Sequence, residues 1–545
     1  MPYIGGKVMR WGLVPTVGVG LLFVGFAVRT SQAERDAASP RYQPRGERRL
    51  VMYYDPQGLW YPTLSTMNPA SKAWQDDPAS WKTGVETIVD AHADAGVDTI
   101  VHCIFSRFST NVAPDVSKVA EPIYDQVPYT EPLKRYHEAG YDLMQILVDR
   151  AHERGLTLMA GMRMNDRHGA ATRAKLYLEH PEWHAQGVPR GLDYAHEGLR
   201  NKVLTFIREV LDRYDVDGIE FDYMRWIYMF SMDEERQGAL LLTDFQRKAR
   251  KLLDEAGRKR GRRLLLSARV PDRLEECEWY GFDVKTWVKE GLVDYLVPSH
   301  FGYMDANVKI EEYRELTEGT DCRIYPSLNR WTGPSRLDKL AKGAGWRPEH
   351  YYATARNYYG FGADGIATYN YQFARFEENI EKLTELSPVR DPRTLAGRHR
   401  DYRFFHRVIG KVHPNNPVGN IKYDVIHLDR SKPGTVGTFA FRIAEDLSGV
   451  RPSAAMDFKA VGMVDQDDIE VSLNGKKVSP ENLTRIHIWD GTNKDKEHEP
   501  YDLIRIDLNG DRVVYGDNEL GVVLTKAGQE GGVIRIEEVG ISVHP

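Results

Sequence analysis

A repeated junction between an amphipathic helix and a short apolar strand is the feature that most constrains this fold. In the clearest case, residues 201–214 place their apolar side chains on one helical stripe, and Asp215-Val216-Asp217-Gly218-Ile219 follows at once. The same turn and apolar run recur at residues 96–100, 291–296 and 362–366. Such junctions are typical of the loops that lead from a helix into a strand of a parallel sheet.

About eight such strands are expected, which is the number that a closed barrel of alternating strands and helices requires. They should begin near Leu50, Thr99, Leu156, Gly218, Leu264, Tyr295, Arg323 and Gly365. The alternation therefore predicts an α/β fold, a (β/α)₈ TIM barrel over residues 48–388. A doubly wound open sheet is the alternative, but no Gly-rich dinucleotide fingerprint follows the first strand.

The remainder of the chain has a different texture. At 545 residues the chain exceeds what one hydrophobic core usually organises, so a second domain is expected. Residues 389–408 are basic and broken by prolines, which indicates a linker. Residues 409–545 carry short alternating runs separated by turns, including Asn474-Gly475, and predict an antiparallel β-sandwich.

The N-terminus has the pattern of a segment that directs export. Basic residues precede an apolar stretch at residues 11–28, and small residues follow near Ala33. This predicts a signal peptide over residues 1–33 and a polar linker over residues 34–47. We expect an exported protein, periplasmic or secreted, without stable membrane insertion after cleavage. An uncleaved N-terminal anchor is the alternative, because the apolar stretch approaches the ~20 residues that span a bilayer.

Composition argues against several classes of function. The net charge is -6, with 73 basic against 79 acidic residues and no long basic run, so nucleic-acid binding is not expected. The three cysteines are too few and too scattered for a disulfide framework or an iron–sulfur site, and we expect buried thiols. The first strand lacks the His-x-His of metal-dependent amidohydrolase barrels, so we expect neither a metal nor another cofactor.

The fourth predicted strand carries the strongest chemical signal. Active sites of such barrels lie at the C-terminal ends of the strands. Gly218, Glu220 and Asp222 share one face of this strand, and the apolar residues between them share the other. Because the apolar set must face the helices, both carboxylates should point into the barrel. Repulsion between them should raise one pKa, giving the protonated and ionised pair that glycoside hydrolysis needs. Pairing with Arg225 or another arginine is the structural alternative.

These residues also carry a family resemblance. The stretch from Tyr214 to Arg225 resembles the fourth-strand signature of the glycosyl-hydrolase-like family 10 barrels. Its Asp-Gly-Ile-x-Phe-Asp core is similar to the strand on which several retaining glycosidase families place a nucleophilic Asp. The resemblance implies that Asp222 is the nucleophile or transition-state stabiliser. Glu220 stands where that family more often has His, so the general acid is either Glu220 or Asp272, which follows the next strand.

Other predicted strand ends carry polar and aromatic side chains suited to a hydroxyl-rich substrate. These candidates are Asp55, Arg107, Arg163, Asn165, Asp166, His168, Arg225, Arg269, His300, Tyr303, Asn329, Trp331, Tyr369, Asn370 and Tyr371. The arginines favour an anionic polysaccharide or oligosaccharide. The leading expectation is an exported glycoside hydrolase. The alternatives are a non-catalytic glycan-binding barrel, and a polysaccharide lyase or transglycosylase on the same fold.

Overall fold

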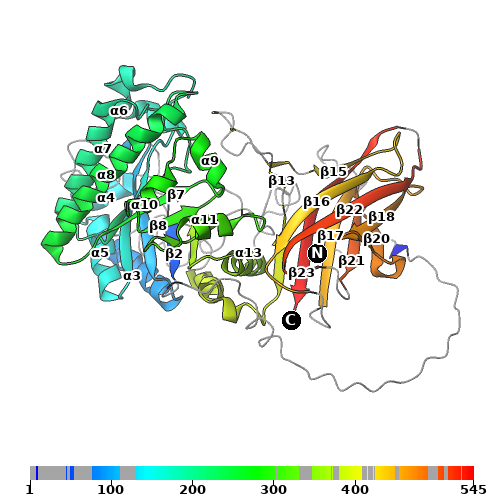
Figure 1. The fold of residues 1–545 in the computed structure, drawn as a ribbon. Coiled ribbons are helices and arrows are strands. Elements are labelled where there is room, and N and C mark those ends of the chain that lie inside the picture. The colour runs from blue at the N-terminus through cyan, green and yellow to red at the C-terminus, as the bar shows by residue number, and fades with distance from the viewer. Residues whose placement is uncertain are drawn as a thin grey trace.

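The computed structural model shows two parts, a curled parallel sheet with helices and a set of antiparallel sheets (Figure 1). It describes residues 8–9, 45, 49–54, 77–110, 131–300, 304–329, 347–369, 371, 380–404, 406–407, 411, 414, 421–422, 424–447, 453–488, 501–508, 513–529 and 531–545. The predicted signal peptide and N-terminal linker lie outside these residues, except for residues 8–9 and 45.

The parallel sheet contains the strands that the sequence pattern predicts. In chain order they are β2 (Leu50–Tyr54), β3 (Thr99–Ser106), β5 (Thr157–Arg163), β6 (Gly218–Asp222), β7 (Leu265–Val270), β8 (Tyr295–Pro298), β9 (Arg323–Ile324), β10 (Ser327–Leu328) and β11 (Ile366–Tyr369). Their order in the sheet is β10-β11-β2-β3-β5-β6-β7-β8-β9, and β4 (Ser109–Thr110) pairs antiparallel with β3. Each predicted strand start lies within one residue of an observed one.

The two ends of this sheet are consecutive pieces of chain. Only Tyr325 and Pro326 separate β9 from β10. The backbone N–H of Tyr325 donates to Leu296 O of β8 at 3.0 Å, and the N–H of Ala367 in β11 donates to Pro326 O at 3.0 Å. The strand pairing itself is interrupted at these two residues, so the paired strands do not form one continuous ring. The architecture is consistent with a TIM barrel, but the hydrogen-bonded strand pairs do not close it into a ring.

Helices cover the outer face of this sheet (Figure 1). They are α3 (Pro78–Asp94), α4 (Glu131–Glu138), α5 (Leu143–Glu153), α6 (Lys175–Leu178), α7 (Glu197–Arg213), α8 (Glu235–Arg260), α9 (Leu274–Trp279), α10 (Val284–Lys289), α11 (Ile310–Leu316) and α13 (Pro348–Gly360). Short 3₁₀ helices include η3 (Gly169–Arg173), η4 (Pro181–Trp183), η6 (Ile380–Arg390), η7 (Pro392–Thr394) and η8 (Pro480–Asn482). Among the helices in the described part of the chain, none combines the length and apolar character needed to cross a membrane.

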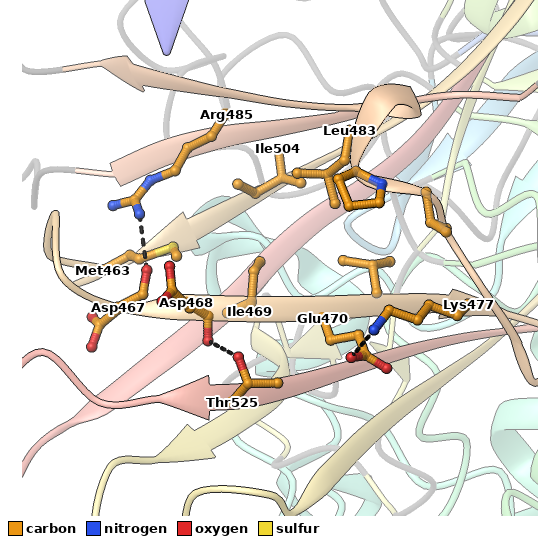
Figure 2. Close-up of a pocket in the computed structure, with 13 residues that line it drawn as sticks. Met463, Asp467, Asp468, Ile469, Glu470, Lys477, Leu483, Arg485, Ile504 and Thr525 are labelled. Atoms are coloured by element: carbon orange, nitrogen blue, oxygen red, sulfur yellow. Dashed lines mark hydrogen bonds and ion pairs between the residues drawn. The ribbon is translucent and has the colours of Figure 1, made fainter. Parts of the chain in front are cut away.

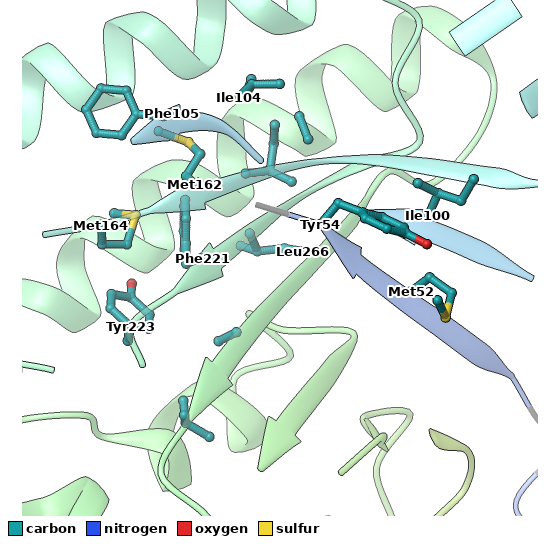
Figure 3. Close-up of a cluster of buried hydrophobic side chains, with 14 of the residues drawn as sticks. Met52, Tyr54, Ile100, Ile104, Phe105, Met162, Met164, Phe221, Tyr223 and Leu266 are labelled. Carbon is teal, nitrogen blue, oxygen red and sulfur yellow. The ribbon is translucent and has the colours of Figure 1, made fainter. Parts of the chain in front are cut away.

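Side-chain alternation divides the sheet into two packed faces. One face contacts the helices and contains Phe221 of β6 and Tyr223 just after it, together with Met52 of β2 and Ile100 of β3 (Figure 3). The other face encloses a separate cluster rich in tyrosine, formed by Val51, Tyr53, Val101, Met159, Tyr295, Val297, Tyr325, Ala367 and Tyr369. The carboxylates of β6 therefore belong to the interior face, as the alternation predicts.

Two antiparallel sheets form the C-terminal part. One contains β1 (Val8–Met9), β12 (Arg400–Arg403), β15 (Asp424–Asp429), β17 (Ser453–Val461), β20 (Leu483–Ile488), β21 (Tyr501–Asp507) and β23 (Val533–His544). The other contains β16 (Val436–Ile443), β18 (Asp468–Leu473), β19 (Lys476–Lys477) and β22 (Gly516–Lys526), and β13 (His406–Arg407) pairs with β14 (Ile421–Lys422). Strands of both large sheets contribute to one apolar cluster, which includes Phe441, Met456 and Leu520. The predicted hairpin is present, with φ of 50° at Asn474 and 74° at Gly475.

The segment at residues 389–408, which we expected to be a linker, is structured over much of its length. It contains β12, which pairs with β23, so the chain enters the C-terminal sheet before residue 409. Asn357 of α13 joins the two parts, because its Nδ2 donates to Arg442 O and its Oδ1 accepts from the N–H of Ala444, both at 2.8 Å. Val389 and Leu395 of this segment pack in the core shared by the helices and the parallel sheet, so the segment packs against both parts.

Candidate active site

Three polar residues form a row across neighbouring strands of the parallel sheet. The register pairs Arg163 of β5 with Asp222 of β6, and Asp222 with Arg269 of β7. Parallel strands in register turn paired residues to the same face, so these three side chains share the interior. One residue pair deeper, Glu220 is aligned with Ser267. The geometry of the site therefore follows from strand register.

Asp222 is held through one of its two carboxylate oxygens. Oδ1 accepts hydrogen bonds from Arg269 Nη1 at 2.9 Å and from the backbone N–H groups of Met224 and Arg225 at 3.0 Å each. No hydrogen bond among the described residues involves Oδ2. Three donors on one oxygen, one of them a charged guanidinium, fix the orientation of the carboxyl group. Asp222 therefore presents an oriented carboxyl group with one oxygen available.

Glu220 lies beneath Asp222 and is fully buried. Its Oε2 accepts from Ser267 Oγ at 2.9 Å, and its Oε1 is buried without a hydrogen-bond partner among the described residues. Burial, and secondly the charge of Asp222, raise the pKa of Glu220 well above its ordinary value. The direction of this shift favours the protonated form of Glu220, and it agrees with the raised pKa that the sequence predicts for one of the two carboxyl groups. Complete burial favours a positioning role through Asp222 over direct proton donation to a substrate.

Replacing Glu220 with Gln tests this distinction. Gln is neutral and can still accept from Ser267, so we expect kcat to fall less than about tenfold, whereas loss of a general acid costs about 10²- to 10⁴-fold. Folded Glu220 holds its proton more tightly than the unfolded side chain, so the wild-type fold loses stability as pH rises above about 4.3. Melting temperatures should therefore favour Glu220→Gln increasingly from pH 4 to 7.

The exposed Glu138 provides the matched control for this experiment, because Glu138→Gln makes the same chemical substitution at the surface of α4. The control should show no such pH trend in melting temperature. If turnover by Glu220→Gln instead drops by about 10²-fold or more and the alkaline limb of the pH–rate profile disappears, Glu220 is the general acid.

Arg269 and Tyr369 brace the row of polar residues. Arg269 is fully buried, and its Nε donates to Ser299 Oγ at 3.1 Å while its Nη2 donates to His300 O at 3.2 Å. Its guanidinium carbon lies 3.7 Å from the centroid of the Tyr369 ring. The hydroxyl of Tyr369 accepts from Arg163 Nη2 at 2.8 Å. These contacts leave the guanidinium of Arg269 little freedom, which preorganises the Asp222 carboxylate.

A second polar chain runs from Asp166 toward the exposed rim. Burial alone would raise the pKa of Asp166, but His168, Arg163 and Arg107 together lower it well below its ordinary value. Asp166 accepts from Ser106 Oγ at 2.5 Å and is hydrogen-bonded to His168 Nδ1. Arg225 Nη2 donates to His168 Nε2 at 2.6 Å, and since arginine only donates, the proton of the imidazole lies on Nδ1. Burial lowers the pKa of His168, which keeps this ring neutral.

Several predicted binding residues instead hold the backbone of loops. Asn165 Nδ2 donates to Leu192 O at 2.8 Å and Tyr228 O at 2.7 Å, and its Oδ1 accepts from the N–H of Leu192. Asn329 Nδ2 donates to His300 O at 3.0 Å, the carbonyl that also accepts from Arg269. These hydrogen bonds therefore stabilise the loops next to the site, through Asn165, Asn329 and the carbonyl of His300.

Two further candidates lie toward the helices. Tyr371 donates to Lys382 O at 3.2 Å and belongs to the apolar cluster on the helix side. Asp272 acts electrostatically on Cys277 and Tyr313, which belong to the same helix-side cluster. These contacts relate both residues to the helix-side cluster, and Asp272 as the alternative general acid stays a prediction. Four other candidates, Asp55, Tyr303, Trp331 and Asn370, lie outside the described residues.

Two site residues were absent from the sequence candidates. Ser267 shares the inward parity of Arg269 on β7, so strand alternation with a register could have identified it. Trp226 follows β6, is half-buried, and contacts His168 edge-on with ring centroids 5.5 Å apart. Its φ of 74° places it in the left-handed region, a backbone feature that no local sequence signal predicts.

Outside this row, the features to consider among the described residues are metal-binding groups, cysteines and a cavity in the β domain. No group of three His, Cys, Asp or Glu side chains among them has an arrangement that could hold a metal ion. The cysteines Cys103, Cys277 and Cys322 form no disulfide and are buried, as predicted. A cavity of about 290 Å³ in the β domain is lined by apolar residues such as Ile469 and Leu483 (Figure 2).

The charged groups of that cavity already have partners. Lys477 forms an ion pair with Glu470, and Arg485 Nη1 donates to Asp467 O at 3.0 Å (Figure 2). The two cations that line the cavity are therefore already paired.

Comparison with known proteins gives one short sequence match and several distant structures. No family model matches the chain. It is 29% identical over 98 residues to "Glycosyl hydrolase DigH" of Escherichia coli (strain K12), a match covering 15% of this chain and 22% of that protein. The PgaB (BpsB) glycoside hydrolase domain from Bordetella bronchiseptica is 11% identical at a TM-score of 0.39, covering 64% of this chain and 99% of the other. The maltogenic alpha-amylase AmyB from Thermotoga neapolitana is 12% identical at a TM-score of 0.36, covering 90% and 98%. The sequence match relates a segment of the chain to a glycosyl hydrolase, and no comparison assigns it to glycosyl-hydrolase-like family 10.

Proposed function

We propose that this chain hydrolyses glycosidic bonds in a polysaccharide or oligosaccharide, with Asp222 as the reacting carboxylate. The observation that carries the proposal is the geometry of Asp222, whose Oδ1 is fixed by three donors while Oδ2 has no hydrogen-bond partner among the described residues. A carboxylate oriented in this way can attack or stabilise the oxocarbenium-like carbon of a sugar. The segment match to a glycosyl hydrolase supports the same class of reaction.

The surroundings of Asp222 suit a sugar ring. Half-buried Trp226 adds an aromatic ring, over which the Arg167 guanidinium lies at 4.7 Å from the centroid, and Arg225 and His168 provide polar groups beside it. We further infer that residues 323–328 act as the closing strand of a (β/α)₈ barrel, because they hydrogen-bond to both β8 and β11. Removal of residues 1–33 during export to the periplasm or medium remains part of the proposal, with an N-terminal anchor as its alternative.

The test is turnover of glycans by the purified full chain in water labelled with ¹⁸O. We expect at least one member of a panel of algal, plant and bacterial polysaccharides to yield new reducing ends that carry the label. An unsaturated end would identify a lyase, and products without label would identify a transglycosylase. Glycan binding without any product would leave the non-catalytic barrel, and any of these three outcomes contradicts the proposal.

A further inference from the structure

Arg107 sits in an unusual turn at the end of β3. The turn joins β3 to β4, with Ser106 paired to Ser109, so Arg107 and Phe108 are its two central residues. Their φ values are 52° and 59°, both in the left-handed region. Two-residue hairpins with this conformation normally use Asn and Gly, because bulkier side chains strain the backbone there. Strain of this kind concentrates at functional sites.

The packing of Phe108 explains how the turn is held. Phe108 is buried and its ring stacks on that of Tyr177, with centroids 6.1 Å apart. This contact anchors the turn but makes no use of the neighbouring guanidinium. The turn therefore fixes the backbone of Arg107 but provides no hydrogen-bond acceptor for its guanidinium.

The guanidinium of Arg107 has no hydrogen-bond partner among the described residues. Its side chain is only 7% exposed, and its Nη1 is shielded from solvent without a partner. Arg107 is close enough to Asp166 to lower the pKa of its carboxyl group. Ser106, Arg163 and His168 already contact that carboxylate, however. A buried cation is costly unless a partner satisfies it, so a bound anion would stabilise this guanidinium.

Positive charge exceeds negative charge around this position. The described arginines in this region are Arg107, Arg163, Arg225 and Arg269, and the carboxylates beside them are Asp166 and Asp222. Burial raises the pKa of Glu220 and lowers that of His168, so neither adds a charge that offsets the arginines. An anionic group would therefore be attracted to this cluster of buried polar side chains, which Arg163 connects to Asp222 through the strand register.

We propose that Arg107 binds an oxyanion substituent of the sugar, a carboxylate or sulfate, so that the glycan acted on is acidic. The planar guanidinium can donate two parallel hydrogen bonds to either group, which a neutral hydroxyl cannot match. The proposal rests on the glycosidase function and names its substrate class. It assigns specificity to a residue that approaches from β3, separate from the reacting carboxylate on β6.

The experiment measures binding of monosaccharides that have no glycosidic bond to cleave. Calorimetry and thermal shift on the full chain compare D-glucuronate with D-glucose, and galactose 6-sulfate with galactose. We expect at least one acidic sugar to bind ten times more tightly than its neutral match. Arg107→Gln should abolish the preference, while Arg208→Gln on the exposed face of α7 should retain it. Without ligand, Arg107→Gln should raise Tm by about 2 °C because it removes a buried unpaired charge.

Arg107→Lys covers the case in which the Gln variant does not fold. Lysine keeps the charge without the planar fork, so the acidic sugar should bind at least threefold more weakly than to wild type. A preference retained in Arg107→Gln, a lower Tm in that variant without ligand, or an equal response to inorganic sulfate alone would overturn the proposal. Because no bond is cleaved, this result is independent of whether Asp222 proves to be catalytic.

Discussion

Asp222→Asn is expected to lower kcat by about 10³-fold or more while the glycan still binds. Asn keeps the shape of the side chain, and its oxygen can still accept from Arg269 and from the two backbone N–H groups. The amide cannot attack or stabilise a cationic sugar carbon, so the loss falls on the chemical step and corresponds to about 4 kcal/mol of transition-state stabilisation. Reducing-end assays measure kcat, and calorimetry should show less than about a tenfold change in Kd.

The matched control is Asp215→Asn, seven positions earlier in the same segment. Asp215 has a half-exposed side chain and pairs with Arg262 at 2.8 Å, so its substitution changes the charge equally at the surface. It should leave kcat within about twofold of the wild type, since exposed ion pairs contribute little. Unchanged product formation by Asp222→Asn would remove Asp222 from the mechanism.

Strand positions and side-chain parity were predictable because both depend on local rules. The helix-to-strand junctions located the strands to within one residue, and alternation along β6 placed Glu220 and Asp222 on the interior face. How deeply Glu220 is buried is a different kind of information. Its depth depends on its alignment with Ser267 of β7, and the pattern of a single strand does not contain that register.

The candidate residues in loops show the same limit. Asn165 and Tyr371 follow strands and have the chemistry of sugar-binding residues, but the path of the chain turns Asn165 to loop carbonyls and Tyr371 to the helix side. The two hairpins make the contrast clear. Asn474 and Gly475 are residue types that tolerate positive φ, so the sequence predicts their turn. Arg107 and Phe108 adopt similar φ values although their residue types disfavour them. Such a departure becomes visible only in three dimensions.

Arg269→Met is expected to destabilise the fold by about 3 to 5 kcal/mol, because it removes one partner of a buried ion pair. Met fills much of the volume but leaves Asp222 without its charged donor, and leaves Ser299 and the carbonyl of His300 without theirs. Contact with the Tyr369 ring is also weakened. Chemical denaturation of the full chain measures the loss, and kcat should fall together with stability because Asp222 is no longer oriented.

The double variant Arg269→Met with Asp222→Asn separates the charge effect from packing. If an uncompensated carboxylate causes the loss, neutral Asn should restore part of the stability, so the two substitutions together cost less than their sum by about 1 to 3 kcal/mol. Arg263→Met is the control, since Arg263 is exposed and pairs with Asp294 at 2.6 Å. It should cost less than about 1 kcal/mol. Strict additivity in the double variant would mean that Arg269 stabilises the fold through packing alone, and that Asp222 does not depend on it for its charge.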